Sequence, residues 1–216
     1  MEAKELIARR VAKEFKDGYV VNLGIGTPTL AARYVPEGIN VVLQSENGFL
    51  GLTDLKGEPD PDVSNAGGQP VGIVPGGAFF DSAMSFAIIR SGRVNATVLG
   101  GLEVDEEGNL ANWMVPGKTI PGMGGAMDLV SGADNVIVAM EHTNKQGQSK
   151  ILKKCTLPLT GRRVVTTVVT QLAYMQVTPE GLVLREVAPG VSTDDVRAAT
   201  EASFLVANDV KCMELA

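Results

Sequence analysis

The sequence predicts an α/β protein, because glycines and prolines divide it into many short apolar segments. The chain of 216 residues contains 25 glycines and 11 prolines, which fits brief strands and helices joined by turns. A helical bundle would need longer uninterrupted periodic segments. The hydrophobic content of 44% is enough to bury a substantial core. The length lies within the range of one large domain, so we expect residues 1–216 to form a single domain.

The charge balance excludes several function classes. The formal net charge is −6, and the lysines and arginines are scattered, so no basic stripe is available for nucleic acid or for an anionic membrane surface. No apolar run approaches the roughly 20 residues needed to span a bilayer, and the charged residues at positions 2, 4 and 5 are unlike a secretory signal. We therefore expect a cytoplasmic protein that acts on small molecules, with Cys155 and Cys212 both reduced.

The N-terminal part of the chain predicts a helix, a strand and a glycine-rich loop in that order. Apolar residues recur at three- and four-residue spacing over residues 1–16, which indicates an amphipathic helix. A β-rich run at 19–23 leads into a glycine-rich turn at 22–28, with Thr27 as the expected N-cap of the next helix and Pro28 at its first position. Such a loop points free N–H groups at an anion or a carbonyl, but a purely structural turn fits equally well.

Glu46 stands on a sharp polar turn directly after the apolar run of residues 39–43. An unpaired buried carboxylate is costly, so a glutamate at the exit of a buried strand is poorly placed for packing alone. Asn47 and Gly48 tolerate left-handed backbone conformations, which lets the chain turn abruptly and leave Glu46 at the mouth of a cleft. Open α/β sheets place their ligands at such strand ends. The alternative is an ordinary strand connection with a solvated glutamate.

Further elements are predicted from periodicity and turn residues. We expect the polar segment 51–65 to be a surface loop bordering the cleft and the acid-rich segment 103–108 to be a solvated hairpin. The segment 164–177 is apolar and β-branched, which favours strands joined by a tight turn, although its length also allows a helix. The other regular segments that we expect are strands at 70–75, 95–99 and 136–140 and helices at 83–90 and 196–202, the last capped by residues 192–195.

Elimination narrows the chemistry to a carboxylate. The chain has one histidine, His142, so a zinc site with two or three histidines is impossible and any catalytic triad would have to use it. Because the chain has no nucleophile motif such as G-x-S-x-G and no phosphate-binding P-loop, we expect His142 to be structural. Gly122, Gly124 and Gly125 form either a tight loop or a set of backbone donors for an oxyanion. Glu46 with two glycine loops has the equipment for covalent catalysis.

Eight short motifs lie in order along nearly the whole chain. They are Asn22-Leu23-Gly24-Ile25-Gly26, Gln44-Ser45-Glu46-Asn47-Gly48, Asn65-Ala66-Gly67, Leu110-Ala111-Asn112-Trp113, Pro116-Gly117-Lys118, Gly122-Met123-Gly124-Gly125-Ala126-Met127-Asp128-Leu129-Val130, Met140-Glu141-His142 and Cys155-Thr156-Leu157-Pro158-Leu159-Thr160. Together they resemble the B subunit of the 3-oxoacid CoA-transferases.

The resemblance implies an open, mostly parallel sheet flanked by helices, of the CoA-transferase type, with Glu46 as nucleophile and the backbone N–H of Gly125 as an oxyanion donor. It implies no metal and no cofactor other than coenzyme A, which is a substrate. In the two-domain mitochondrial relatives a lysine follows the segment 65–67, whereas Gly68 follows it here, so a role of that lysine in holding CoA is not carried over. The residues to which we assign substrate or CoA binding lie in the glycine loops and turns: Asn22, Gly24, Gly26, Asn47, Gly48, Gly67, Gln69 and Gly124.

The expected activity is transfer of CoA from succinyl-CoA or acetyl-CoA to a 3-oxoacid carboxylate through a glutamyl-CoA thioester on Glu46, as in ketone body metabolism. Acetoacetate and 3-oxoadipate both stay open as the 3-oxoacid. The resemblance also implies that the chain works in a hetero-oligomer with a CoA-transferase A subunit. Two other interpretations stay open: a sugar-phosphate isomerase of related fold that uses Glu46 as a base, and a non-catalytic protein that only binds its ligands.

Overall fold

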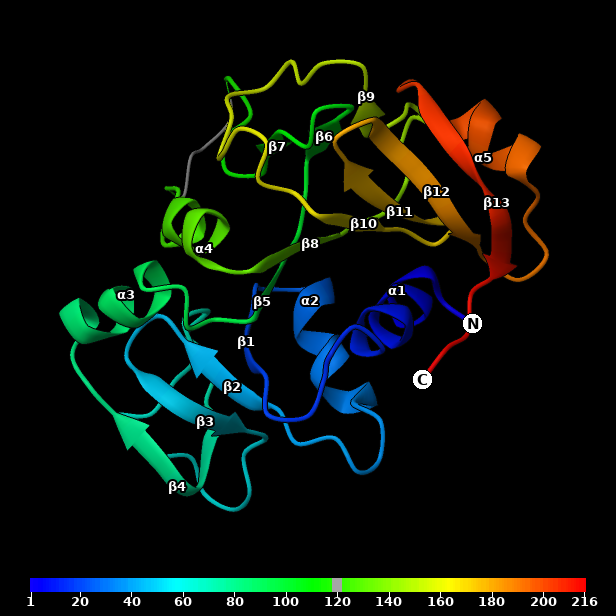
Figure 1. Cartoon of the computed structure of the whole chain (residues 1–216). Helices are drawn as coiled ribbons and strands as arrows, with labels where there is room; N and C mark the ends of the chain where they lie inside the picture. Colours follow the sequence, from blue (N-terminus) through cyan, green and yellow to red (C-terminus); the bar gives the residue numbers. More distant parts are fainter. Residues whose placement is uncertain (118–121) are drawn as a thin grey trace.

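The computed structural model describes residues 1–117 and 122–216, so Lys118 of the sequence motifs lies outside the described residues. One ten-stranded sheet, with strand order β13-β12-β11-β10-β8-β5-β1-β2-β3-β4, runs through the molecule (Figure 1). Its strands are β1 (Val20–Leu23), β2 (Val42–Ser45), β3 (Phe49–Thr53), β4 (Gly72–Phe79), β5 (Ala96–Leu99), β8 (Asn135–Ala139), β10 (Thr167–Val169), β11 (Ala173–Thr178), β12 (Gly181–Val187) and β13 (Phe204–Cys212). The helices are α1 (Ala3–Ala12), α2 (Thr27–Leu30), η1 (Ala31–Tyr34), α3 (Ser82–Arg90), α4 (Ala126–Gly132) and α5 (Thr193–Ala199).

The centre of the sheet is parallel and its two sides are largely antiparallel. Strands β10, β8, β5, β1 and β2 pair in parallel. β3 and β4 extend the sheet with antiparallel pairing on one side, and β11 and β12 do so on the other, with β13 parallel to β12. The prediction of an open, mostly parallel sheet flanked by helices is confirmed. Because the carboxyl ends of parallel strands meet at one edge, the loops after β1 and β2 lie together there.

Two hydrophobic cores cover the two faces of the sheet. On one face α1 contributes Ile7 and Val11, which pack with Val21 and Val98 of the central strands. On the other face α3, α4 and α5 pack against side chains that alternate with the first set, such as Val138. Figure 1 shows α1 and α2 together on one side of β1 and β5, and α3 with α4 on the other. Polar side chains in the central strands are therefore enclosed between protein layers and must find protein partners.

The acid-rich segment is a hairpin, as predicted, but it is not solvated throughout. β6 (Glu103–Asp105) pairs with β7 (Leu110–Ala111) and with β9 (Ile151–Leu152) in a small second sheet. Asp105 is only 1% exposed, and its carboxylate accepts hydrogen bonds from the Asn109 side-chain amide at 2.9 Å and the Cys155 N–H at 3.0 Å. The prediction was wrong for Asp105 because these donors replace its hydration and allow the carboxylate to be buried.

Other boundaries differ from the sequence expectation by a few residues. Residues 51–53 belong to β3 and not to the predicted loop, and β4 continues beyond the predicted 70–75 to Phe79. The predicted N-terminal helix ends at Ala12, and the last helix begins at Thr193 instead of Val196, with Ser192 forming the predicted capping box. The two-strand interpretation of 164–177 is confirmed by β10 and β11. Strands β12 and β13 were not predicted.

Two general expectations bear on the class of protein. Cys155 and Cys212 are both free thiols, as expected. Within the described residues, no helix combines the length and the apolar character needed to cross a membrane.

Candidate active site

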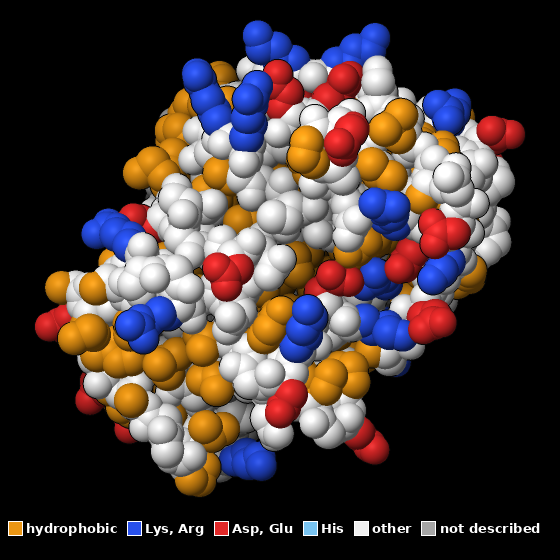
Figure 2. Space-filling view, viewed as in Figure 1, with side chains coloured by type: hydrophobic (Ala, Val, Ile, Leu, Met, Phe, Trp, Pro, Cys, Tyr) orange, Lys and Arg blue, Asp and Glu red, His pale blue; other side chains and the backbone are white. Residues whose placement is uncertain are grey.

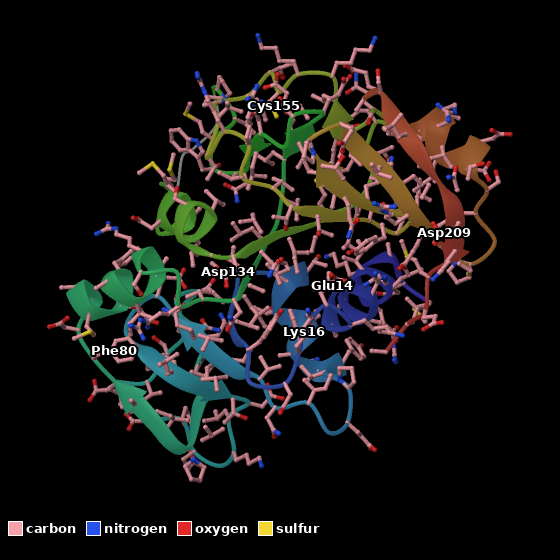
Figure 3. All side chains as sticks on the ribbon, in the orientation of Figure 1. Glu14, Lys16, Phe80, Asp134, Cys155 and Asp209 are labelled. Carbon is pink, nitrogen blue, oxygen red and sulfur yellow. The ribbon has the colours of Figure 1, made fainter. Side chains whose placement is uncertain are left out.

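Glu46 lies on a tight turn between β2 and β3 whose geometry depends on glycine. Gly48 has a φ of 135°, which L-residues rarely adopt, and a Cβ at this position would clash with the carbonyl oxygen of Phe80. The Phe80 N–H donates to the Gly48 carbonyl oxygen at 2.8 Å, so the connection from β4 to α3, where Figure 3 labels Phe80, packs directly on the turn. Gly48 thus shapes the turn that presents Glu46, while its assignment to ligand binding stays a prediction.

The side chain of Asn47 is engaged with protein atoms. Its Oδ1 accepts from the Ser45 hydroxyl at 2.6 Å, and its Nδ2 donates to the carbonyl oxygen of Ser64 at 2.7 Å. Ser45 Oγ in turn accepts from the Ala66 N–H at 3.2 Å. These contacts fix the segment before β4 against the Glu46 turn, so the geometry gives Asn47 an anchoring role rather than a free side chain for a ligand.

The turn at residues 65–69 is held by one side chain. Asn65 Oδ1 accepts from the backbone N–H groups of Gly67 and Gln69 at 2.9 and 3.0 Å. A Cβ on Gly67 would lie 3.2 Å from Ile25 Cγ1, so glycine lets this turn approach the loop that follows β1. Gly67 therefore reaches the site, whereas Gln69 contributes its backbone to the turn and its side chain is exposed.

Asn22 is the residue that contacts the Glu46 carboxylate most directly. It is 1% exposed, and its Nδ2 donates to Glu46 Oε2 at 2.9 Å and to Gln44 Oε1 at 2.7 Å. Gln44 Nε2 donates to the Ser85 hydroxyl of α3 at 3.1 Å. The sequence predicts Asn22 as a binding residue but does not identify Gln44 or Ser85. A polar residue in an otherwise apolar strand was the available signal for Asn22 and Gln44. The sequence around Ser85 contains no comparable signal.

Gly125 lies beside Glu46, although the two are far apart in the chain. It is the N-cap of α4, and a Cβ on it would lie 3.5 Å from Glu46 Cγ and 3.2 Å from the Phe86 ring. An ion pair of 2.7 Å between Arg90 and Asp128 joins α3 to α4 and so holds this helix start in place. The structure therefore brings the two residues predicted as catalytic together. Gly124, with φ of 57°, is exposed and has open space where a Cβ would stand.

The glycine loop after β1 opens α2. The Gly24 N–H donates to the Val98 carbonyl oxygen at 2.8 Å, and a Cβ on Gly24 would lie 3.1 Å from the same atom, so the loop packs against the end of β5. Gly26, with φ of 90°, is the N-cap of α2. The prediction of Thr27 as N-cap was wrong by one residue, because the helix already begins at Thr27, and Pro28 is its second residue.

A cavity of about 590 Å³ connects these elements, and Glu46 lies in its wall together with Gly24 and Gly67. The other predicted site residues do not line it: Asn22, Gly26, Asn47, Gly48, Gln69, Gly124 and Gly125. Arg33 is the one lysine or arginine in the wall within the part of the chain that the structure describes. About half of the wall is aliphatic, and this part includes Leu23, Ile25, Leu30, Leu43, Val71 and Val74. The cavity thus offers a mixed polar and apolar surface with two carboxylates, Glu46 and Asp54, and one cation.

His142 takes no part in this site. It is fully buried after β8, with Nδ1 2.9 Å from Thr170 Oγ1 and Nε2 2.8 Å from Thr200 Oγ1. Burial lowers its pKa from 6.5 to about 4, so the imidazole is neutral, which agrees with the structural role that we expected. Among the described residues, no group of three or more His, Cys, Asp or Glu side chains is placed to hold a metal ion.

Comparison with known proteins bears directly on this arrangement. The family model described as coenzyme A transferase matches residues 4–199. The chain is 61% identical to the beta subunit of the acetate CoA-transferase of Haemophilus influenzae over all 216 of its residues and 97% of that protein. It is 53% identical to the B subunit of the succinyl-CoA:3-ketoacid coenzyme A transferase of Helicobacter pylori, over 94% of this chain and 99% of that protein.

A solved structure gives the same fold. An acyl-CoA transferase from Escherichia coli matches 99% of this chain with a TM-score of 0.80 at 22% sequence identity, and this chain spans 43% of the length of that protein. The resemblance noted in the sequence is therefore confirmed at the level of the family. With the matching family model and relatives that are more than 50% identical over almost the whole length, the chain belongs to the coenzyme A transferase family.

Proposed function

We propose that this chain is the nucleophile-bearing subunit of a CoA-transferase, which moves CoA between an acyl-CoA and a carboxylic acid through a glutamyl-CoA thioester on Glu46. The observation that carries the proposal is the state of the Glu46 carboxylate on the cavity wall. Its Oε2 accepts a hydrogen bond from Asn22, while Oε1 has no hydrogen-bond partner among the described residues. One oxygen is thus held and the other is free to attack.

In the first step, Oε1 of Glu46 attacks the carbonyl carbon of the thioester. The carbon–sulfur bond then breaks, CoA leaves as the thiolate, and an acyl-glutamyl anhydride remains. The backbone N–H of Gly125 makes no hydrogen bond within the described residues and lies beside Glu46, so it can donate to the oxyanion that develops in this step. A carboxylate is a weak nucleophile, and the rate must therefore come from positioning and from binding of the distant CoA body.

In the second step, the CoA thiolate attacks the Glu46 carbonyl carbon of the anhydride. Negative charge develops on Oε2, the oxygen to which Asn22 already donates at 2.9 Å. The bond from the Glu46 carbonyl carbon to Oε1 then breaks, and the first acid leaves with Oε1. The product is the glutamyl-CoA thioester, and a second carboxylic acid reverses both steps to become the new acyl-CoA. All atoms and electrons balance without water or a redox reaction.

The relatives guide the choice of substrates. One is named for acetate, and the other for succinyl-CoA and a 3-ketoacid. We propose acids of this kind for the present chain, with succinyl-CoA or acetyl-CoA as donor and a 3-oxoacid as acceptor, because the aliphatic part of the cavity wall suits short acyl chains. Side-chain cations bind phosphate strongly, and Arg33 alone contributes one to the described wall, which favours the CoA-transferase over a sugar-phosphate isomerase. A protein that only binds its ligands would have no need of the Asn22–Glu46 contact.

A partner chain completes the proposed enzyme. Both relatives are named as subunits, and large hydrophobic side chains are exposed on the loop after β1, the end of β4 and the first turns of α3 and α4. Ile25, Phe79, Met84 and Met127 are 74%, 59%, 54% and 53% exposed, respectively. Figure 2 shows hydrophobic side chains gathered over α3 and β4 at the lower left. We propose that an A subunit covers this surface, which would exclude water from the anhydride and the thioester.

Trapping of the covalent intermediate tests the proposal. The chain is expressed with its neighbouring-gene partner and mixed with acetoacetyl-CoA or succinyl-CoA in the absence of an acceptor acid. Intact mass should rise by one CoA, and hydroxylamine or borohydride should remove this mass. The adduct should be absent in Glu46→Ala and present in Glu37→Ala, a matched control at an exposed glutamate. An adduct that persists in Glu46→Ala would refute the assignment.

Expression with and without the partner tests the need for a second chain. CoA exchange between succinyl-CoA and acetoacetate should be measured for the isolated chain and for the mixture, together with sedimentation of each sample. Activity that arises only on mixing, along with a larger species, is the expected result. Full exchange by the isolated chain would show that no A subunit is needed.

A further inference from the structure

Three polar side chains form a row across the central strands, directly beneath the Glu46 turn. Asn22 of β1 pairs in register with Gln44 of β2 on one side and with Thr97 of β5 on the other. Paired residues of neighbouring strands lie about 4.8 Å apart and point to the same face of the sheet. All three are buried, at 1%, 3% and 0% exposure respectively. Central strands of a parallel sheet are normally apolar on both faces, so this row needs an explanation.

One end of the row is fixed by α3. Ser85 is fully buried, and its hydroxyl oxygen accepts from Gln44 Nε2 at 3.1 Å. This contact turns Gln44 Oε1 toward Asn22, where it accepts from Nδ2 at 2.7 Å. The same Nδ2 donates its second hydrogen to Glu46 Oε2. Ser85 therefore sets the orientation of the Gln44 amide, and Gln44 sets the orientation of the Asn22 amide that faces Glu46.

The other end of the row contains two unpartnered polar atoms on residues that pair in register, Asn22 and Thr97. Asn22 Oδ1 and Thr97 Oγ1 are the buried side-chain atoms without a hydrogen-bond partner within the described residues. One is an acceptor and the other carries a hydroxyl hydrogen, so the two are complementary. Leaving both unpaired would cost the desolvation free energy of each group. A hydrogen bond between the two, direct or through one water molecule, would satisfy both.

We propose that Thr97 is a positioning residue for the nucleophile: its hydroxyl donates to Asn22 Oδ1, directly or through one buried water, and so holds the Asn22 amide with its NH₂ toward Glu46. The proposal rests on the proposed function of Glu46. A reversed Asn22 amide would place Oδ1 against the Glu46 carboxylate and against Gln44 Oε1, both of which are acceptors. The hydroxyl of Thr97 and the Ser85–Gln44 pair prevent this reversal from opposite sides.

The consequence for the reaction is a choice between the two Glu46 oxygens. With the Asn22 amide held, Oε2 is always the retained oxygen and Oε1 always the attacking one. Without Thr97, the amide also samples the reversed orientation, in which neither the carboxylate nor the later oxyanion on Oε2 has its donor. Because one such hydrogen bond is worth roughly 1.4 kcal/mol, the formation of glutamyl-CoA should slow about tenfold.

Substitution of Thr97 tests the proposal in the heteromer with its partner chain. Thr97→Val removes the hydroxyl at nearly constant shape, Thr97→Ser keeps it, and Thr167→Val is the matched control at a buried strand threonine of β10. The rate of glutamyl-CoA formation in a single turnover should fall about tenfold in Thr97→Val, with KM for acyl-CoA unchanged. It should return to within about twofold in Thr97→Ser and stay unchanged in Thr167→Val. Ser85→Ala should slow the same step from the other end of the row.

Two outcomes would overturn the proposal. One is a Thr97→Val rate within twofold of the natural protein, and the other is an equal loss in Thr97→Val and Thr167→Val, which would indicate a general packing effect. If Thr97→Val does not fold, Thr97→Ala, which also removes the hydroxyl, decides in the same way. Hydrogen exchange of the Asn22 side-chain NH₂, followed by NMR in protein labelled at asparagine, reports whether Thr97 holds the Asn22 amide and requires no turnover. Faster exchange in Thr97→Val supports the positioning role of Thr97 even if the natural protein forms no adduct. The absence of an adduct would refute only the covalent mechanism.

Discussion

Asn22 and His142 are both buried polar residues. The groups around them differ in whether each polar atom has a hydrogen-bond partner. Thr200 donates its hydroxyl to the Val196 carbonyl oxygen at 2.6 Å, so toward His142 it accepts from Nε2–H at 2.8 Å. The Thr170 hydroxyl lies 2.9 Å from the other ring nitrogen, Nδ1, and 3.3 Å from the Ala173 carbonyl oxygen, so it donates to the nearer acceptor, Nδ1. Both ring nitrogens are satisfied in the neutral form. Around Asn22, by contrast, Glu46 Oε1 has no partner within the described residues.

Whether every polar atom has a hydrogen-bond partner distinguishes structural groups from reactive groups better than burial or residue type does. A closed set of hydrogen bonds contributes to stability and has nothing to offer a ligand. A carboxylate that is held at one oxygen and free at the other is positioned, yet still available for bond formation. The histidine would attract attention first in a search for catalytic groups, because imidazole titrates near neutral pH. Its completed partners and lowered pKa assign it to the scaffold instead.

The largest effect should come from removing the free oxygen of Glu46. Glu46→Gln keeps the shape and the hydrogen bond to Asn22 but abolishes the nucleophile, and we expect turnover to fall by roughly 10⁴-fold or more. The free energy of unfolding should change by less than about 1 kcal/mol, because a turn side chain contributes little to the core. Turnover assays together with urea unfolding measure both quantities. Residual turnover within a hundredfold of the natural protein would contradict a covalent role.

Gly125 should give the next largest effect. Gly125→Val would place its side chain near Phe86 and Glu46 Cγ, which lie 3.2 and 3.5 Å from the Cβ position. Displacement of the N–H donor should lower kcat by about 10²- to 10³-fold. Gly124→Ala is a useful comparison, since open space surrounds that Cβ position, although its φ of 57° adds backbone strain. Equal activity of a folded Gly125→Val variant and the natural protein would argue against the oxyanion role.

The sequence predicted the parts of this site that depend on local turn chemistry or on a motif. Glu46 was found from a charged residue after an apolar run, and Gly125 from a glycine cluster together with the family resemblance. Gln44 and Ser85 were missed as members of the site because their roles depend on register and packing. Gln44 stands opposite Asn22 only because β1 and β2 pair with that offset. Ser85 reaches Gln44 only because α3 folds back over the sheet.

The missed fold elements have a related cause. β12 and β13 are parallel neighbours at one side of the sheet, and half or more of their residues are at least partly exposed. Their sequences therefore lack the continuous apolar character that marked β5 and β8, in which nearly every residue is buried. Periodicity identifies the buried centre of a sheet more readily than its solvated side strands.

The burial of His142 should make the stability of the protein depend on pH in the acid range. The pKa of His142 is lowered from 6.5 to about 4 by burial, so between these values the unfolded chain binds a proton that the folded protein does not. Stability should therefore fall as the pH drops from 6.5 toward 4 and level off below that, by a total of about 3 kcal/mol from this residue. Since the chain has one histidine, His142→Gln should flatten this part of the pH profile. Urea unfolding between pH 4 and 8 measures the slope, and an identical slope in both proteins would contradict the assignment.

The smallest effect should come from Thr200. Its substitution is the most direct test of whether the hydrogen bonds around His142 serve stability alone. Its hydroxyl accepts from His142 and donates to the carbonyl oxygen of Val196 in α5, so Thr200→Val leaves a buried Nε2–H without an acceptor. We expect a loss of about 1–2 kcal/mol in the free energy of unfolding, because an unsatisfied buried donor costs that much. Thr200→Ser retains the hydroxyl and should lose less than about half of this. CoA exchange per folded molecule should be unchanged in both variants, since neither residue lines the cavity. If Thr200→Val lowers turnover at unchanged stability, the His142 cluster serves the reaction after all, and the separation between the two clusters fails.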